Sequence, residues 1–440
     1  MYGSLYYVRE IMIMKQKLLI FIFFGLFIFL LVGCNNDADV ENTKPKFEYQ
    51  YDSDYNASII KYNGTDKNVE IPNTVSYESN EYTINCIESG AFSNCGIEEV
   101  VIPNTLIKMG TSAFSQCKFL NKVSFKDGIK LEYLNHDVFS GCSNLKSICI
   151  PKSIKCISTG VFAYCNSLSE ITFETGSVLE EIDREAFEHC SSLKSICIPK
   201  TVKTIAEEAF VECESLNEIT FEAGSKLKSI GIRAFFSCES LKSLVLPSNL
   251  EVIDRSCFFH CTNLESVSFE PESKLKEIGD SAFDSCTSLK TIEIPSSVKK
   301  VSANAFYYCN NLEYTVYENG SYLGNANNPY VILMNYDTKA NEGIINNNTV
   351  IIGEKAFYFF AKLKSIVIPN SVEIICAGAF KYCYEMESIV IPKTVKHIDS
   401  AFGNCDKLTI YCELDSKPEE WCETWNSGVN VVWGFQNGNN

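Results

Sequence analysis

The chain has 440 residues and a formal net charge of −17, from 55 acidic and 38 basic side chains. Because nucleic-acid-binding proteins normally present a basic face, this balance argues against a nucleic-acid partner. Apolar residues make up 46% of the chain, which excludes wholesale disorder, and four histidines leave little room for a histidine-built metal or acid–base centre. The 21 cysteines are unusual for a chain of this length and need an explanation.

Residues 1–33 have the pattern of an export signal. Residues 18–32 are almost all apolar, and Lys15 and Lys17 precede them. A stretch this short after basic residues is typical of a secretory signal peptide, since a membrane-spanning helix needs about 20 apolar residues. Met14 opens a more typical signal than Met1, so the true start of the chain stays open between the two.

The end of this segment, Leu31-Val-Gly-Cys34, resembles a bacterial lipobox. The resemblance implies that Cys34 receives the lipid and becomes the first residue of the mature chain. The lipid would make the membrane a partner and hold the exported protein at the cell membrane, on the extracytoplasmic or extracellular side. Whether that membrane is an inner or an outer one stays open. Residues 34–46 are polar and are interpreted as a tether.

An Ala-Phe pair, or a close variant, marks a repeat along most of the chain. The spacing between marks is 22–25 residues, with one gap of 51. The marked phenylalanines are Phe92, Phe114, Phe139, Phe162, Phe187, Phe210, Phe235, Phe258, Phe283, Phe306, Phe357, Phe380 and Phe402. Each unit also holds an Ile-x-Ile or Ile-x-Phe stretch or a close variant, whose period of two predicts a short strand with one buried face. The Ala-Phe segment suits a tight turn or a short helix. One such unit cannot bury its own apolar side chains, so the units are expected to stack.

This repeat closely resembles the BspA-type leucine-rich repeat of bacterial surface proteins, over about residues 47–435. The segment Asn56–Thr65 looks like the usual N-terminal cap, and Tyr411–Trp421 with Trp433–Phe435 looks like the closing cap. The resemblance implies a leucine-rich-repeat solenoid of short parallel strands, with about 13 repeats capped at both ends. It also implies surface display, adhesion or binding of host proteins, and it supplies no catalytic or cofactor-binding residues.

The repeat marks divide the chain into seven segments. These are the signal peptide 1–33, the tether 34–46, the N-terminal cap and first strands 47–90, leucine-rich repeats 91–314, an insertion 315–350, further repeats 351–410, and the C-terminal cap and tail 411–440. The insertion is rich in Tyr and Asn and has two interpretations. It is either a diverged repeat whose hairpin pairs with the sheet, or a protrusion that binds a partner. In the second case the candidate partner-binding residues are Tyr317, Tyr322, Tyr330 and Tyr336.

The cysteines follow the same period. Twelve of them lie three residues after a marked phenylalanine: Cys95, Cys117, Cys142, Cys165, Cys190, Cys213, Cys238, Cys261, Cys286, Cys309, Cys383 and Cys405. The thirteenth mark has Phe360 in this slot, which indicates a ladder of buried thiols acting as small apolar side chains. Single cysteines spaced this widely do not make a tetrahedral metal site. Cys149 and Cys197 are expected to point outward, and Cys412 and Cys422 could either bridge the C-terminal cap or be buried separately.

The remaining chemistry-bearing residues give no active site. No histidine has the register with Ser, Cys or Asp that a catalytic triad needs, and no carboxylate pair stands out among the 55 acids. We therefore predict no catalytic residue, metal or cofactor. The leading hypothesis is a lipid-anchored, non-enzymatic surface protein that binds a protein or glycan partner by adhesion or host interaction. The alternatives are a structural or shielding surface scaffold without a dedicated ligand and, more remotely, a hydrolase on a solenoid.

Overall fold

The computed structural model describes residues 45–340 and 342–436. Within these ranges the regular elements are β-strands joined by turns and irregular segments, with no helix. No helix there could therefore cross a membrane. The strands stack as a leucine-rich-repeat solenoid of about 16 turns. This exceeds the number of marks because strands such as β3 (Asn68–Glu70), β26 (Ile332–Tyr336) and β33 (Asn430–Val432) come from segments without an Ala-Phe pair.

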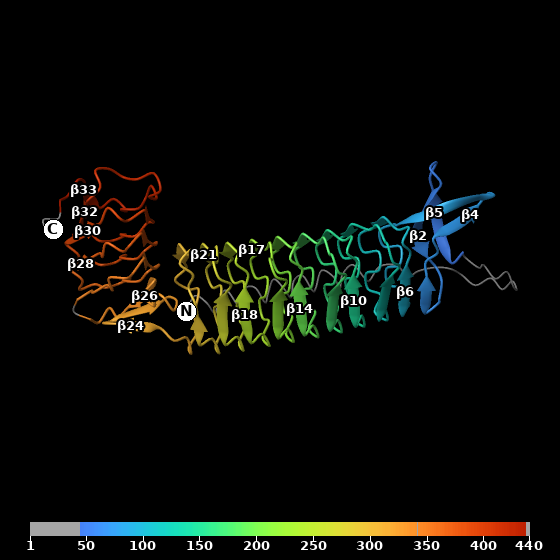
Figure 1. Ribbon diagram of the computed structural model, residues 1–440, viewed down its shortest axis with the longest axis horizontal. Helices are drawn as coiled ribbons and strands as arrows, with labels where there is room; N and C mark the ends of the chain where they lie inside the picture. The colour runs from blue at the N-terminus through green and yellow to red at the C-terminus, as the bar shows by residue number, and fades with distance from the viewer. Residues whose placement is uncertain (1–44, 341, 437–440) are drawn as a thin grey trace, which may run out of the picture. The chain divides into compact units, whose positions relative to one another are not determined.

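Each turn of the first part contributes one longer strand to a row of parallel strands, which Figure 1 shows as adjacent arrows. With β3, the row comprises β6 (Glu99–Ile102), β8 (Lys122–Phe125), β10 (Ser147–Ile150), β12 (Glu170–Phe173), β14 (Ser195–Ile198), β16 (Glu218–Phe221), β18 (Ser243–Leu246), β20 (Ser266–Phe269) and β22 (Thr291–Ile292). In β14, Ile196 and Ile198 are buried while Ser195 and Cys197 are exposed, as a period of two requires. A proline directly follows β6, β10, β14 and β18 and ends them, because it has no N–H to donate to the ladder.

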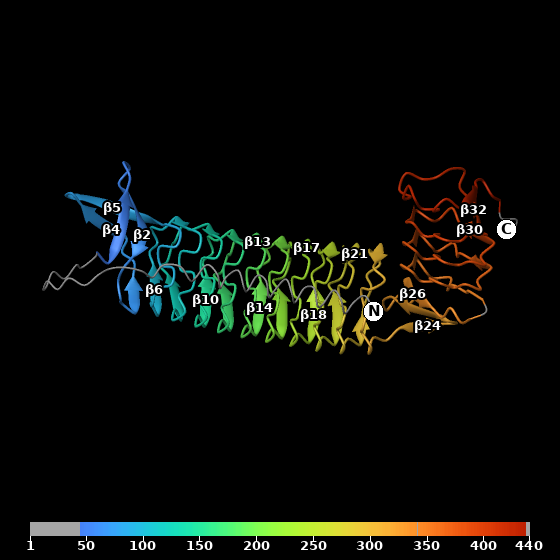
Figure 2. The same cartoon turned by 180° about the vertical axis from the view of Figure 1, so that it is seen from behind.

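A second row of parallel strands, two residues each, lies on another side of the stack (Figure 2). It comprises β7 (Lys108–Met109), β9 (Tyr133–Leu134), β11 (Cys156–Ile157), β13 (Glu181–Ile182), β15 (Thr204–Ile205), β17 (Ser229–Ile230), β19 (Val252–Ile253), β21 (Glu277–Ile278) and β23 (Lys300–Val301). Its register places residues of the same slot side by side, for example Ile205 against Ile230. A residue therefore meets residues about 23 or 25 positions away.

The Ala-Phe segment forms the remaining side of each turn and is not helical. The amides of Glu208, Phe210 and Glu212 donate to carbonyls of the next turn, with N···O distances of 2.7–2.9 Å. Glu208 and Glu212 have φ of 57° and 58°, in the left-handed region that favours glycine. Such a conformation costs about 1–2 kcal/mol for a residue with a side chain, and the hydrogen bonds between turns offset it. Because left-handed residues recur along the segment, its backbone cannot take the consecutive right-handed dihedral angles that a short helix needs.

The marked phenylalanines of the first repeats, Phe92 to Phe306, form a continuous stack through the core. From Phe92 to Phe306 successive ring centroids lie 4.6–5.7 Å apart. Tyr62 of β2 (Asn56–Tyr62) stacks on Phe92 at the N-terminal end. This strand pairs with β1 (Phe47–Tyr51) and β5 (Asn80–Ile87), and β5 also pairs with β4 (Thr74–Tyr77). Antiparallel strands and aromatic rings thus close the first end of the stack.

The segment after Phe306 begins with an antiparallel meander of β24 (Thr315–Tyr317), β25 (Gly320–Leu323) and β26. Strand β26 then pairs in parallel with β27 (Ile351–Ile352), so the segment rejoins the sheet as a diverged repeat. The stack restarts with Tyr336, whose ring centroid lies 4.8 Å from that of Phe357. The remaining strands are β28 (Ser365–Val367), β29 (Ile374–Ile375), β30 (Ser388–Ile391), β31 (His397–Ile398), β32 (Thr409–Cys412) and β33. Trp421 and Trp425 are buried at this end.

Candidate functional site

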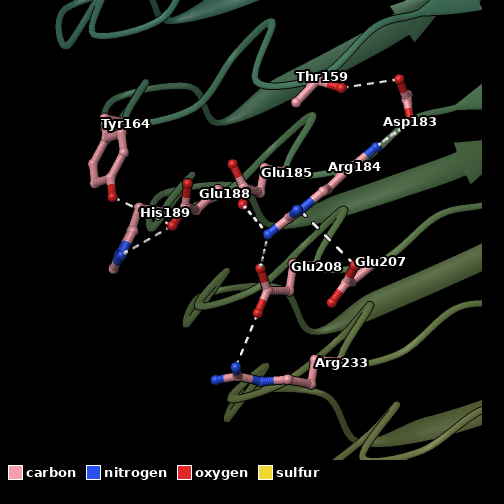
Figure 3. Close-up of polar contacts among 10 residues, drawn as sticks. All are labelled: Thr159, Tyr164, Asp183, Arg184, Glu185, Glu188, His189, Glu207, Glu208 and Arg233. Carbon is pink, nitrogen blue, oxygen red and sulfur yellow. Dashed lines mark hydrogen bonds and ion pairs between the residues drawn. The ribbon is translucent and has the colours of Figure 1, made fainter. Parts of the chain in front are cut away.

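The Ala-Phe sides of successive turns carry a cluster of charged side chains that the sequence analysis did not single out. We call it the acidic patch. It consists of Thr159, Tyr164, Asp183, Arg184, Glu185, Glu188, His189, Glu207, Glu208, Glu212 and Arg233. Figure 3 shows ten of these residues, all but Glu212, with their polar contacts. Many of its contacts join neighbouring turns, because the ladder brings residues 23–25 positions apart together, as in His189 and Glu212.

His189 is the centre of the first half of the patch. Its Nδ1 lies 3.0 Å from an oxygen of Glu212, and both residues lie two positions after a marked phenylalanine. The hydrogen bond with Glu212 raises the pKa of His189, and the same bond lowers the pKa of Glu212. The ring of Tyr164 stacks on the His189 ring, and its hydroxyl donates to Glu188 at 3.3 Å. Burial raises the pKa of Glu188.

Arg184 holds the second half together. Its guanidinium lies 3.0 Å from Glu185, 3.6 Å from Glu208 and 3.9 Å from Glu207, and Glu185 contributes most to raising its pKa. Glu208 also binds Arg233 at 2.9 Å (Figure 3). The carboxylates of the patch are thus largely paired within the protein. With six acids against two arginines the patch is negative when His189 is neutral, so it presents fixed charge and hydrogen-bond acceptors.

A cluster of exposed and half-buried aromatic rings lies on the same side of the later turns. This aromatic ledge comprises Tyr358, Phe359, Tyr382 and Tyr384. Phe359 and Tyr382 occupy the same slot as His189 and stack with centroids 4.4 Å apart, while Phe359 is half exposed. Tyr358 and Tyr384 lie edge-on to Phe359. Their spacing from the marks at Phe357 and Phe380 was the signal that could have identified the ledge from sequence.

The four candidate tyrosines of the insertion divide into two pairs. Tyr322 and Tyr336 are fully buried, and both hydroxyls bond to nearby backbone: Tyr322 accepts from Asn346, and Tyr336 donates to the carbonyl of Glu342. The prediction that these two contact a partner is wrong, because the insertion supplies a rung whose tyrosines fill the core where other turns use phenylalanine. Tyr317 and Tyr330 are half-buried and lie edge-on to each other at 6.0 Å, so their contact with a partner stays a prediction.

The thiols of the cysteine ladder lie inside the stack. Eleven of the twelve are buried, Cys95 is half-buried, and all are free. Each of the eleven donates its S–H to the carbonyl of the marked phenylalanine one turn before, with Sγ···O distances of 3.0–3.3 Å. The cysteines therefore link turns as weak donors as well as filling space. Burial raises the pKa of Cys165 to about 12.

Four other described cysteines with a predicted position lie outside the cysteine ladder. Cys149 and Cys197 are exposed on the long strands, and Cys412 and Cys422 of the C-terminal cap are both free. Cys34 lies outside the described residues. No group of three or more His, Cys, Asp or Glu side chains arranged to hold a metal ion occurs in ranges 45–340 and 342–436.

Comparison with known families assigns the repeat. The BspA type leucine rich repeat region matches residues 67–180, 180–313 and 334–416, more than half of the chain. The protein belongs to the BspA-type leucine-rich repeat family. The unmatched residues 314–333 hold β24 and β25, whose antiparallel pairing differs from the parallel rungs of the BspA-type repeat. A comparison with curated proteins found no match.

Several solved structures resemble this BspA-type protein. A leucine rich cell surface protein from Faecalibacterium prausnitzii is 22% identical, covering 91% of this chain and 99% of its own, with a TM-score of 0.43. The pneumococcal vaccine antigen PcpA is 19% identical, covering 88% of this chain and 96% of its own, with a TM-score of 0.46. The leucine rich repeat protein of T. pallidum is 27% identical over 44% of this chain and 88% of its own, with a TM-score of 0.39.

Proposed function

We propose that this BspA-type protein is a lipid-anchored, non-enzymatic protein of the bacterial surface that binds a protein or glycan partner. The observation that carries the proposal is the alignment of equivalent exposed slots along the Ala-Phe side of the turns. Successive turns there place aromatic rings together in the aromatic ledge and charged groups together in the acidic patch. Stacked repeats of this type offer extended surfaces to large ligands.

The aromatic ledge is the recognition anchor in this proposal. Exposed aromatic rings on a rigid support bury much area on contact and lose little conformational entropy, which is why they dominate binding energy at interfaces. Phe359 and Tyr382 belong to turns whose backbones are joined by the inter-turn ladder, and Phe359 N–H donates to the carbonyl of Lys381 at 3.0 Å. The ring pair is therefore held in place before a partner arrives.

Two other observations support the lipid anchor and the non-enzymatic role in this proposal. The lipobox-like segment ending at Cys34 supports attachment to a membrane and display outside the cytoplasm. The carboxylates with opposite pKa shifts, Glu188 and Glu212, are engaged by Tyr164 and His189, which favours a structural role over acid–base chemistry.

A shielding scaffold without a dedicated ligand is the second candidate. It is favoured by the exposed face of the long strands, where small side chains such as Ser195, Cys197 and Ser243 predominate. Side chains of this size make few contacts with a partner, whereas a repeated layer of them covers a surface without recognising one molecule.

The test measures binding of the full chain, in a non-ionic detergent, to arrays of extracellular matrix proteins and glycans. Saturable binding is expected, and the double variant F359A/Y382A should weaken it. The matched control is Y307A/Y308A, which removes another exposed aromatic pair. Equal losses in both variants would place recognition outside the ledge. Failure of every arrayed ligand to saturate would favour the shielding scaffold.

A further inference from the structure

A basic hollow stands out on this acidic chain. It has a volume of about 500 Å³ and lies beside the segments that connect the long strands β14 to β20 with the short strands β15 to β21. Its lining residues are Lys203, Lys226, Lys228, Asn249, Glu251 and Lys274. Four lysines against one glutamate give this hollow a formal charge of +3, whereas the whole chain carries −17.

The backbone ladder explains why the lysines come together. The amide of Lys228 donates to the carbonyl of Lys203 at 2.9 Å, and the amide of Glu251 donates to the carbonyl of Lys228 at 2.8 Å. These residues therefore occupy one slot in three successive turns, spaced by about 4.8 Å as neighbouring strands are. Lys226 and Lys274 lie two residues before this slot in their own turns.

In most turns this slot holds ion pairs between neighbours. Lys155 pairs with Glu132 at 2.8 Å, Lys203 with Glu180 at 2.8 Å, and Lys276 with Glu251. The alternation of acid and base fails at Lys228, which follows Lys203 instead of a glutamate. It fails once more at Lys299, which does not line the hollow.

The failure leaves two ammonium groups outside any close ion pair, since Lys226 and Lys228 act on Glu180 and Glu251 only at longer range. Among the residues that the structure describes, neither Lys226 nor Lys228 has a carboxylate oxygen within 4.0 Å, and both side chains are exposed. Lys274 donates to the side-chain oxygen of Asn249 at 2.8 Å, which is a neutral acceptor. Like charges on adjacent turns repel, so an anion placed between them would relieve that repulsion.

We propose that the hollow binds a segment of an anionic polysaccharide. The ammonium groups would take its sulfate or carboxylate groups as point charges, and the aliphatic lysine stems that form the walls would pack against the sugar rings. The volume falls within the range of known ligand sites, about 300–1,000 Å³. No aromatic side chain lines the hollow, so it lacks the stacking platform of single-stranded nucleic-acid sites. This inference deepens the proposed function by naming a glycan class and a second site.

The test is calorimetric titration of the full chain, in non-ionic detergent, with size-defined heparin and polygalacturonate oligosaccharides. The two ligands distinguish sulfate from carboxylate recognition, and binding of either supports the proposal. The variant K226E/K228E should lose at least about tenfold in affinity, and K226Q/K228Q should lose less. The matched control is K146E/K194E, which makes the same charge change at exposed lysines outside the hollow and should stay within about twofold of the parent. Rising salt should weaken binding.

Three results would overturn the proposal: no binding of either oligosaccharide, equal losses in K226E/K228E and K146E/K194E, or stronger competition by polyglutamate or single-stranded DNA than by heparin. These results do not bear on the aromatic ledge, whose own test is F359A/Y382A. Failure here is therefore distinguishable from failure of the proposed function.

Discussion

At the scale of single residues, the His189–Glu212 pair sets a pH response. A histidine with a raised folded pKa contributes stability that is fully present below about pH 6.5, its unfolded value, and is lost as pH rises through the folded pKa. A glutamate with a lowered folded pKa contributes stability that is present above about pH 4.5 and is lost as pH falls through the folded pKa. The pair should therefore stabilise the fold most between about pH 4.5 and 6.5.

Titration of His189 by NMR checks this prediction. The pKa of His189 should lie above 6.5 in the parent protein and fall in Glu212→Gln, because the charge-assisted hydrogen bond is removed. Glu207→Gln is the control, since Glu207 lies in the same patch but faces Arg184. An unchanged His189 pKa in Glu212→Gln would contradict the assignment.

The left-handed residues of the Ala-Phe segments give a second prediction. Ser237 has φ of 55°, whereas Ser240, three residues later, is not in this region. Ser237→Gly should leave stability unchanged or raise it by about 1 kcal/mol, because relief of strain outweighs the greater freedom of the unfolded chain. Ser240→Gly should lower it by about 0.5–1 kcal/mol. Chemical denaturation midpoints of the two variants test this ordering. The reverse order would contradict the presence of backbone strain at Ser237.

The thiol ladder gives a third prediction. Cys213 donates to the carbonyl of Phe187, which lies 3.2 Å from its Sγ. A serine at 213 would find the same acceptor, so Cys213→Ser should cost no more than Cys213→Ala, at about 1–2 kcal/mol each. Denaturant unfolding measures both. A much larger loss for serine would mean that the thiol acts as an apolar side chain alone. Alkylation of the native protein should label Cys149 and Cys197 first, because they are exposed.

At the scale of one turn, the phenylalanine stack sets how far a disturbance spreads. Phe210 is fully buried and lies 4.9 Å from Phe187 and 5.0 Å from Phe235. Phe210→Ala should cost about 3–5 kcal/mol, as deep core truncations do. Each turn contacts mainly its neighbours, so hydrogen exchange should rise in adjacent turns and stay unchanged near Trp421.

The half-exposed Phe236 is the control for this experiment. It stacks on Phe259 at the surface, with centroids 5.0 Å apart, and does not belong to the core stack. Phe236→Ala should change exchange much less than Phe210→Ala. A uniform rise along the whole chain in Phe210→Ala would contradict nearest-neighbour stacking.

At the scale of the whole molecule, the proposed lipid anchor at Cys34 is the feature that would hold the protein at a membrane. Cys34→Ala should leave an unlipidated precursor, because the lipobox-like segment has no other thiol to accept the diacylglycerol. Incorporation of labelled fatty acid, with fractionation of membranes, measures the outcome. The control is Cys197→Ala, which removes an exposed thiol of the solenoid and should be lipidated normally. Normal labelling and processing of Cys34→Ala would refute the anchor.

The buried half of the molecule follows largely from the sequence. Each marked phenylalanine lies in the core, as do the two isoleucines of stretches such as Ile196–Ile198, because a repeated apolar slot can be buried only when similar units stack. The prediction of a leucine-rich-repeat solenoid with parallel strands is confirmed. The choice between turns and short helices was open in the sequence, since one Ala-Phe segment is too short for its period to decide. Hydrogen bonds to the next turn decided it.

The contacts among the exposed side chains were decided by the tertiary structure. The pairs His189–Glu212 and Phe359–Tyr382 share a slot but lie 23 residues apart, so they meet only after the turns have stacked. The sequence leaves Tyr336 as a candidate partner-binding residue, because the 51-residue gap contains a turn that has no Ala-Phe mark. A regular spacing determines which slot a residue occupies. Only the stacked neighbours determine whether that side chain is paired, buried or, like Lys228, left facing solvent.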